Sequence, residues 1–194
     1  MWFDADHGII DSPANPDQFS LLPGVESAIR TLNHLGVPVV IVSNQPGVAK
    51  GKLVPALLDA ITRKLTDALA GADAYVDGVY YCMHHPQAAV SDYCVNCDCR
   101  KPEPGLILRA ARDLDLDLRR SFMVGDGVTD IQAGRRAGCR TIWVGQMKCD
   151  RCQLMRTHDG TPDHVVADLP AAVDRILSVW RAVDPTLSIG DTSP

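Results

Sequence analysis

The sequence has no long run of charges of one sign and no apolar stretch that approaches the roughly 20 residues of a membrane-spanning helix. Its net charge is −5, which is mildly acidic. The first residues also lack the basic and apolar regions of a secretory signal. These absences argue against a nucleic-acid partner and a membrane partner, and we expect a cytoplasmic protein. The net charge is still compatible with an anionic substrate, because a phosphate site needs only a few local cations.

Internal repeats and low-complexity segments are also missing, and 194 residues are enough for one domain with a sizeable core. We expect this domain to span residues 1–182 and a frayed polar tail to cover residues 183–194. The seven cysteines are an odd number, and they lie in clusters. This pattern favours metal binding in a reducing compartment over a framework of disulfides.

Short continuous runs of apolar residues alternate with amphipathic stretches along the chain. The strongest strand candidates are continuously apolar and rich in β-branched residues; they cover residues 37–42, 122–124 and 141–144. Weaker candidates cover residues 76–81 and 164–166, and helical spacing of apolar residues lies between the strands. The alternation predicts an α/β fold, a Rossmann-like three-layer sandwich in which helices cover both faces of a parallel sheet.

Two closely spaced pairs of metal ligands flank a loop in the middle of the chain. Cys82 and His84 form a Cys-x-His pair, and Cys97 and Cys99 form a Cys-x-Cys pair. Three thiolates and one imidazole are the ligand set of a closed structural zinc site, and four such ligands rarely pair up around a loop by chance. We therefore predict a zinc ion that pins this loop.

The neighbouring residues leave two alternatives for this ligand set. Cys94 could replace Cys97 as a thiolate ligand. His85 could replace His84, although the proline that follows it indicates a turn that points His85 away.

A second pair of cysteines, Cys149 and Cys152, lies close in sequence to His158 and His164. These residues could form another metal site, but their spacing matches no established zinc pattern. Free thiols near a loop are the simpler interpretation. Cys139, which follows a glycine, is predicted to be a core residue.

Polar side chains directly follow two of the predicted strands. Ser43 and Asn44 end the first strand, and the next residues can present backbone N–H groups to a phosphate oxygen. Asp126 and Asp130 follow the strand over residues 122–124, and two carboxylates there suit Mg²⁺. Alternatively, Asp130 simply caps the next helix. Because parallel sheets bind ligands at the carboxyl ends of their strands, we predict a phosphate and metal site there.

Arg100 and Lys101 come directly after the second pair of zinc ligands, so a zinc ion would hold this cationic pair in place. The order Ser-Asn-Gln, then Cys-x-His, Cys-x-Cys-Arg-Lys-Pro-x-Pro-Gly and finally Gly-Asp-x-x-x-Asp resembles one family. It is the D-glycero-D-manno-heptose 1,7-bisphosphate 7-phosphatases of the haloacid-dehalogenase (HAD) superfamily, with histidinol-phosphate phosphatase as a near relative. The resemblance runs from about Leu22 to about Gly145, and the zinc loop is its most specific part.

This resemblance implies a role for each matching residue. Ser43 and Lys101 would stabilise the transferring phosphoryl group, and Asp126 would hold Mg²⁺. The residues that would bind or position the substrate are Asn44, Gln45 and Arg100. Such a distribution suits phosphoryl transfer, which depends on cations and donors around the equatorial oxygens of the phosphoryl group.

The nucleophile is the part of the resemblance that fits poorly. The family's reaction starts from an Asp-x-Asp-Gly-Thr/Val motif, whose first Asp attacks phosphorus and whose second Asp is the general acid–base. The candidates here are Asp4 and Asp6, but too few residues precede Asp4 for a strand of about five, and His7 follows Asp6 in place of glycine. One hypothesis places the nucleophile strand upstream of Met1, and the alternative is that Asp4 and Asp6 act.

The resemblance also implies where the nucleophile strand belongs in the sheet. It lies at the centre, between the strand that ends at Ser43 and the strand that precedes Asp126. On the upstream hypothesis these two neighbours would face an empty slot, along which backbone groups lack partners.

The sequence therefore predicts a monomeric phosphatase without a large cap, which uses Mg²⁺ and a structural Zn²⁺ to hydrolyse a phosphomonoester of a small phosphorylated sugar. Two alternatives remain open at this point. One is a histidinol-phosphate phosphatase. The other is a catalytically inactive zinc- and phosphate-binding domain, in which the Asp-x-Asp motif is absent or degenerate.

Overall fold

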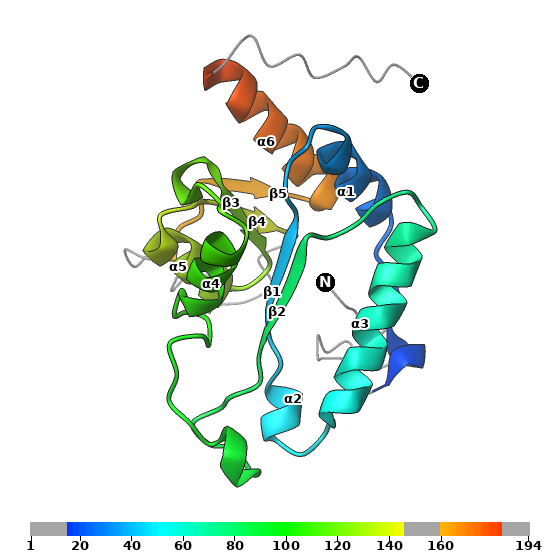
Figure 1. Cartoon of the computed structure of the whole chain (residues 1–194). Helices are drawn as coiled ribbons and strands as arrows, with labels where there is room; N and C mark the ends of the chain where they lie inside the picture. Colours follow the sequence, from blue (N-terminus) through cyan, green and yellow to red (C-terminus); the bar gives the residue numbers. More distant parts are fainter. Residues whose placement is uncertain (1–14, 146–159, 184–194) are drawn as a thin grey trace.

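The computed structural model describes residues 15–145 and 160–183 (Figure 1). The strands and longer helices follow one another along the chain as α1 (Val25–His34), β1 (Val40–Asn44), α2 (Pro46–Ala49), α3 (Pro55–Ala70), β2 (Gly78–Cys82), α4 (Gly105–Asp113), β3 (Phe122–Gly125), α5 (Val128–Ala137), β4 (Arg140–Val144), β5 (His164–Val166) and α6 (Leu169–Val183). Three 3₁₀ turns are η1 (Pro16–Gln18), η2 (Ser91–Tyr93) and η3 (Leu118–Arg120).

All the strand pairs in the described ranges are parallel, as predicted. β1 pairs with β2, and β4 pairs with both β3 and β5. These strands form two sheets, β1-β2 and β3-β4-β5, and no described strand lies between β1 and β3. The split falls between the two strands that the resemblance places on either side of the nucleophile strand.

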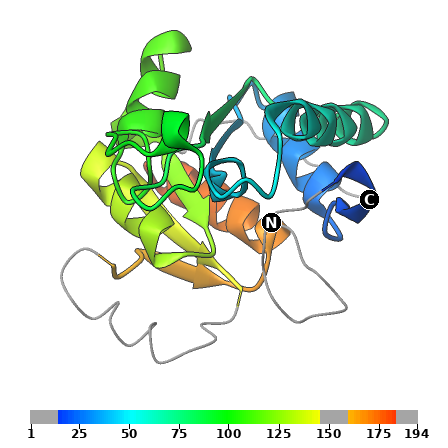
Figure 2. The same ribbon diagram turned by 90° about the horizontal axis from the view of Figure 1, so that it is seen from below.

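Helices cover both faces of the three-stranded sheet, which gives the predicted layered α/β architecture (Figures 1 and 2). Alternation along β4 decides which helix each side chain meets. Ile142 and Val144 pack with Ala172 and Ile176 of α6, whereas Trp143, between them, packs against Ile131 of α5. This two-sided burial explains why β4 is continuously apolar in sequence.

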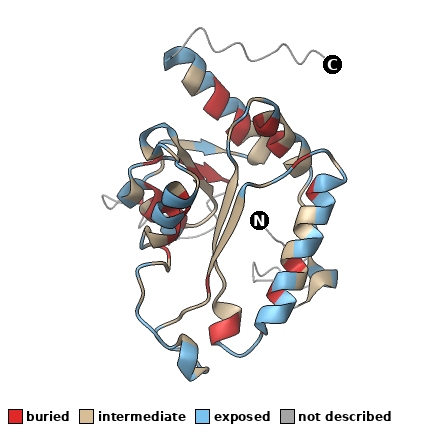
Figure 3. Cartoon of the chain, in the orientation of Figure 1, coloured by how far each residue is buried: buried red, intermediate tan, exposed pale blue. Residues whose placement is uncertain are grey.

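The two sheets share packing through helices on either side. On one side, Val42 of β1 packs against a buried cluster that contains Ile107 of α4 and Met123 of β3. On the other side, α6 contacts α1, and Leu32 of α1 packs in one buried cluster with Val173 of α6. Figure 3 shows buried residues concentrated where α6, α1 and β4 meet. The carboxyl ends of β1 and β3 are therefore held near each other although the strands are not paired.

The boundaries of the first strand differ from the prediction. The expected strand over residues 37–42 begins at Val40 and extends to Asn44. Pro38 has no N–H to donate, and the preceding turn uses Gly36 with a φ of 67°, so regular pairing starts after both residues. Pairing with β2 instead continues through Ser43 and Asn44. Both predicted site residues therefore lie on the strand itself.

No helix in the two described ranges is long and apolar enough to cross a bilayer. The prediction of one domain over residues 1–182 stays a prediction, because it includes ranges that the structure does not describe.

Candidate phosphate and metal site

Lys101 lies at the carboxyl ends of β1 and β3 and is 9% exposed. Its Nζ lies 2.6 Å from Oδ1 of Asp130 and donates a hydrogen bond of 2.8 Å to the carbonyl of Val42. Val42 belongs to β1 and Asp130 to α5, which follows β3, so this side chain bridges the two sheets. A charge buried to this degree needs a partner and hydrogen bonds, and Lys101 has both.

Asp130 has a second role at the start of α5. Its Oδ2 accepts a hydrogen bond of 3.0 Å from the backbone N–H of Gly127. The helix-capping alternative for Asp130 therefore holds, and the same carboxylate is also the counter-ion of Lys101. Sequence reasoning missed this ion pair. Its only sequence signal is a carboxylate one helical turn after Asp126, which a cap alone would explain.

Gly125 makes room for this carboxylate at the end of β3. A Cβ atom built on Gly125 would lie 2.5 Å from Oδ2 and 2.6 Å from Cγ of Asp130. Such distances are well inside van der Waals contact, so any side chain at position 125 would displace Asp130. The glycine before Asp126 is therefore required by the close approach of helix and strand.

Asp126 directly follows β3 and is half-buried. Burial raises the pKa of its carboxyl above the ordinary value of 3.8, and the negative charge of Asp130 raises it further. Both effects disfavour the charged carboxylate, and a bound cation would reverse them. The charge of Lys101 opposes these effects but is outweighed by them, so an oxygen ligand at this strand end fits a hard cation such as Mg²⁺.

Asn44 lies opposite Lys101 at the end of β1. Its Oδ1 accepts a hydrogen bond of 3.0 Å from the backbone N–H of Lys101, and its Nδ2 donates one of 3.0 Å to the Lys101 carbonyl. The amide is thus committed to the backbone of a single residue. The predicted role of Asn44 in positioning the substrate is untested by this geometry.

Ser43 and Gln45 form a small polar group beside Asn44. The Nε2 of Gln45 donates a hydrogen bond of 3.2 Å to Oγ of Ser43. The Oε1 of Gln45 is buried, and no hydrogen-bond partner lies within reach of it among the described residues. Because buried polar atoms in proteins are nearly always paired, this acceptor marks a position where a ligand hydroxyl could bind.

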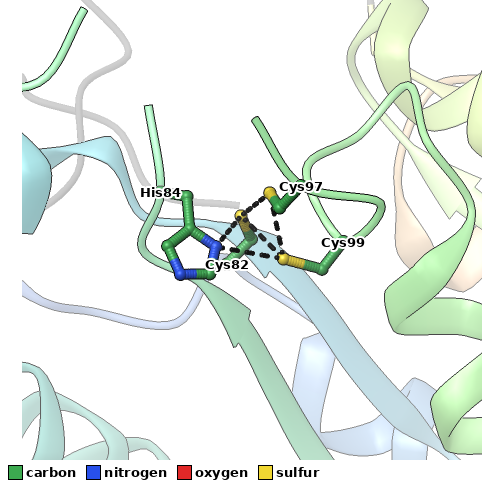
Figure 4. A group of neighbouring side chains, drawn as sticks. All are labelled: Cys82, His84, Cys97 and Cys99. Atoms are coloured by element: carbon green, nitrogen blue, oxygen red, sulfur yellow. Dashed lines mark hydrogen bonds between the residues drawn. The ribbon is translucent and has the colours of Figure 1, made fainter. Parts of the chain in front are cut away.

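The four predicted zinc ligands lie together (Figure 4). One atom from each of Cys82, His84, Cys97 and Cys99 lies within 4.8 Å of the other three. The three sulfur–sulfur distances are 3.2, 3.3 and 3.6 Å, and Nδ1 of His84 lies 3.4 Å from the sulfur of Cys99. Zn–S bonds of about 2.3 Å give tetrahedral edges of about 3.8 Å, so the cluster fits a zinc ion after small adjustments.

The two alternative ligands lie outside this cluster. Cys94 is exposed, and its sulfur lies 3.5 Å from the carbonyl of Pro86. The Nδ1 of His85 accepts a hydrogen bond of 3.1 Å from the backbone N–H of Gln87. The geometry therefore favours Cys97 over Cys94 and His84 over His85.

The zinc cluster joins the phosphate site through short covalent and hydrogen-bonded paths. Cys82 ends β2 and is the register partner of Asn44, and its carbonyl accepts a hydrogen bond of 2.7 Å from the N–H of Gln45. Arg100 follows Cys99 directly and donates a hydrogen bond of 3.2 Å to the carbonyl of His84. Zinc would therefore fix the backbone on both sides of the cationic pair.

Other predicted residues are placed as follows. Cys139 is buried in the cluster around Met123, as predicted, and burial raises its pKa to about 11. His164 starts β5 and is half-buried. Outside the described residues lie Asp4, Asp6, Cys149, Cys152 and His158, so the nucleophile hypotheses and the second metal site stay predictions.

Comparisons with known proteins agree with this geometry. The sequence profile of the HAD-hydrolase-like family matches residues 98–172. The chain is 36% identical over 171 residues to a D-glycero-beta-D-manno-heptose-1,7-bisphosphate 7-phosphatase of Salmonella typhi, an alignment that covers 88% of this chain and 89% of the relative. It is 41% identical over 136 residues to a protein of the same name from Escherichia coli K12, with 70% of each chain covered.

The fold is likewise similar to solved structures of proteins with related names. A D,D-heptose 1,7-bisphosphate phosphatase from B. bronchiseptica, complexed with magnesium and phosphate, superposes with a TM-score of 0.73 at 35% identity. This superposition covers 86% of the present chain and 88% of the other. A D,D-heptose 1,7-bisphosphate phosphatase from Burkholderia thailandensis has a TM-score of 0.60 at 27% identity, over 84% of this chain and 90% of that one.

Proposed function

Because this chain belongs to the D-glycero-beta-D-manno-heptose-1,7-bisphosphate 7-phosphatase family of HAD-like phosphatases, we propose that it releases the 7-phosphate of a heptose 1,7-bisphosphate in a Mg²⁺-dependent reaction. The observation that carries this proposal is the buried ammonium of Lys101 at the carboxyl ends of β1 and β3. A fixed cation there stabilises negative charge that develops on a phosphoryl group.

Lys101 has donor capacity left for a substrate. An ammonium group carries three N–H donors. Asp130 and the Val42 carbonyl take two of them, and no third acceptor is found for it in the part of the chain that the structure describes. We assign the remaining N–H to an oxygen of the transferring phosphoryl group, with the hydroxyl of Ser43 as a second donor.

Arg100 and Gln45 supply contacts for the rest of the sugar phosphate. The guanidinium of Arg100 uses one nitrogen on the His84 carbonyl, which orients the group and leaves further donors for a second phosphate. The unpaired Oε1 of Gln45 is placed to accept a hydrogen bond from a sugar hydroxyl. A substrate with one phosphate to be transferred, a second phosphate and several hydroxyls matches this set of groups.

Each of the two metals has residues that would hold it. Asp126 would bind Mg²⁺, which when bound neutralises charge on the phosphoryl oxygens. The zinc ligands would be Cys82, His84, Cys97 and Cys99, and zinc would act on structure alone, because all four of its positions are filled by protein.

The identity of the attacking carboxylate is a separate question, tested by variants at Asp4 and Asp6. If Asp4 is the nucleophile, Asp4→Asn abolishes turnover, and the Asp6→Asn variant loses its general acid–base. Unchanged turnover in Asp4→Asn would assign the attack to another carboxylate.

The proposed substrate is tested by phosphate release from three compounds at equal concentration: a heptose 1,7-bisphosphate, the corresponding heptose 1-phosphate and histidinol phosphate. We expect the bisphosphate to have by far the highest kcat/KM and to lose only its 7-phosphate. Preference for histidinol phosphate would assign the chain to the related activity. Phosphate binding without turnover of any compound would indicate the inactive binding domain.

We also propose that the chain acts as a cytoplasmic monomer. Every cysteine in the described ranges has a free thiol, which fits a reducing compartment. Light scattering coupled to size-exclusion chromatography tests the oligomeric state, and a mass of twice 21.0 kDa would show a dimer instead.

A further inference from the structure

Two asparagines in this fold form the same pair of hydrogen bonds with a distant backbone. Asn33 of α1 accepts a bond of 2.9 Å from the N–H of Tyr75 and donates one of 3.2 Å to its carbonyl. Asn44 of β1 does the same to Lys101, at 3.0 Å for both bonds. In each case a side-chain amide replaces the backbone partner that the residue lacks.

Turn hydrogen bonds from Glu103 to Arg100 and from Gly105 to Asp98 hold the chain on either side of Lys101, but neither involves the backbone of Lys101 itself. The segment between η2 and α4, residues 94–104, contains no helix or strand, so regular secondary structure provides no partners for its backbone. The strand β1 provides them instead. Asn44 binds both backbone polar groups of Lys101, and Val42, two residues earlier on the same strand, accepts the bond from its Nζ.

This arrangement fixes Lys101 at both ends to a single strand. The backbone is set by the Asn44 amide, and the ammonium lies between the Val42 carbonyl of β1 and Oδ1 of Asp130 on α5. Ser43 lies between these two residues on the same strand. The spacing between the Lys101 ammonium and the Ser43 hydroxyl therefore depends on how firmly Asn44 holds Lys101.

We propose that Asn44 is a positioning residue, which acts on the phosphoryl-transfer site through the backbone of Lys101 and not by contact with the substrate. This inference rests on the proposed function of Lys101. It differs from the role that the family resemblance implies for Asn44, which is to position the substrate itself. Without the two hydrogen bonds from Asn44, the Lys101 ammonium can shift, and a misplacement of about 1 Å costs on the order of a hundredfold in rate.

The two roles predict different behaviour in a double-mutant cycle with Asn44→Ala and Lys101→Ala. A residue that acts through Lys101 has no further effect once Lys101 is gone, whereas a residue that touches the substrate adds its own loss. We expect Asn44→Ala alone to lower kcat roughly ten- to a hundredfold with KM changed less than about threefold. In the Lys101→Ala background it should change the residual rate by less than about twofold.

Asn33→Ala is the matched control, because it removes the same pair of hydrogen bonds on the other side of the fold. We expect it to lower the melting temperature and to leave kcat within about twofold of the wild type. If Asn44→Ala does not fold, Asn44→Asp replaces it, since the carboxylate keeps the acceptor for the Lys101 N–H, although it loses the donor and adds a negative charge. Zinc content and circular dichroism establish folding for each variant.

The same double-mutant cycle can be measured without turnover. Its readout is then the affinity of each variant for inorganic phosphate, measured by calorimetry with Mg²⁺ present. The proposal requires that Asn44→Ala weaken phosphate binding only when Lys101 is present. Multiplicative losses from the two substitutions, a rise in KM without a fall in kcat, or an equal loss of kcat in Asn33→Ala would each overturn it. If the wild type turns over no phosphomonoester, the proposed function fails, and the phosphate cycle alone decides the role of Asn44. A wild type that neither turns over substrate nor binds phosphate overturns both.

Discussion

The ammonium of Lys101 and the carboxylate of Asp130 lie 2.6 Å apart, and their side chains are 10% and 11% exposed. An ion pair this far from water costs free energy to desolvate, and its partners depend on each other. Its position at the junction of the two sheets, next to the predicted metal ligand Asp126, connects the stability of the fold with the proposed chemistry. The first prediction follows from this dependence.

Lys101→Met should destabilise the protein by about 3–5 kcal/mol, because it leaves the Asp130 charge buried without a partner. The double variant Lys101→Met with Asp130→Asn should recover most of that loss, since the asparagine oxygen can still accept from the Gly127 N–H. Turnover should be at least about a hundredfold below that of the wild type in both variants, because both lack the Lys101 ammonium. Chemical denaturation and phosphate release measure the two effects separately. A double variant no more stable than the single one would contradict a role for unpaired charge.

Cys97→Ser should remove zinc from the protein and lower its melting temperature. The sulfur of Cys97 lies 3.2 Å from that of Cys99 and 3.6 Å from that of Cys82, within the predicted ligand set. Cys94→Ser is the matched control, because Cys94 is exposed and outside the cluster. Elemental analysis of protein purified without added metal should give one zinc per chain for the wild type and for the control. Full zinc occupancy in Cys97→Ser would exclude this ligand set.

Asp126→Asn should stabilise the metal-free protein at neutral pH and abolish its response to Mg²⁺. Burial and Asp130 raise the pKa of Asp126, so the folded protein binds this proton more tightly than the unfolded chain does. By linkage, the contribution of Asp126 to stability is greatest in acid and falls as the pH rises from 3.8 through the raised pKa. At neutral pH the ionised group is unfavourable until a cation binds.

Melting curves with and without Mg²⁺, recorded at several pH values, measure this effect. We expect Mg²⁺ to raise the melting temperature of the wild type and not that of Asp126→Asn. An equal Mg²⁺ response in both proteins would place the ion elsewhere.

Gly125→Ala should lower both stability and turnover, because its Cβ would lie 2.5 Å from Oδ2 of Asp130 and displace the counter-ion of Lys101. Gly71→Ala is the control. The residue ends α3 with a φ of −62°, and the nearest atom to its added Cβ lies 3.5 Å away, so alanine fits there. Denaturation midpoints and kcat, measured for both variants, test the difference. Normal activity in Gly125→Ala would show that the end of β3 can move enough to accommodate the added Cβ.

Much of this arrangement could be predicted because the signals are local. Continuous apolar runs predicted β1, β3 and β4, and the two closely spaced ligand pairs predicted which four side chains meet at the zinc cluster. The sequence could not indicate that Asp130 pairs with Lys101, because that contact joins residues on different elements. Asn44 shows the same limit: a polar residue at a strand end has one sequence signature whether it binds a ligand or a backbone.

The predicted zinc ligands join the phosphate site by two short paths, the hydrogen bond from Gln45 to the Cys82 carbonyl and the chain itself from Cys99 to Lys101. A metal ion at the four ligands would close the loop between them at its base, and Figure 1 shows η2 at the far end of that loop, away from the sheets. Tyr93 of η2 packs against the buried cluster that contains Val48, whereas Ser91 and Asp92 are exposed, so substitutions at these two exposed positions would leave Lys101 where it is. The exposed tip of the loop can therefore vary in sequence while the predicted zinc ligands and Lys101 keep their places.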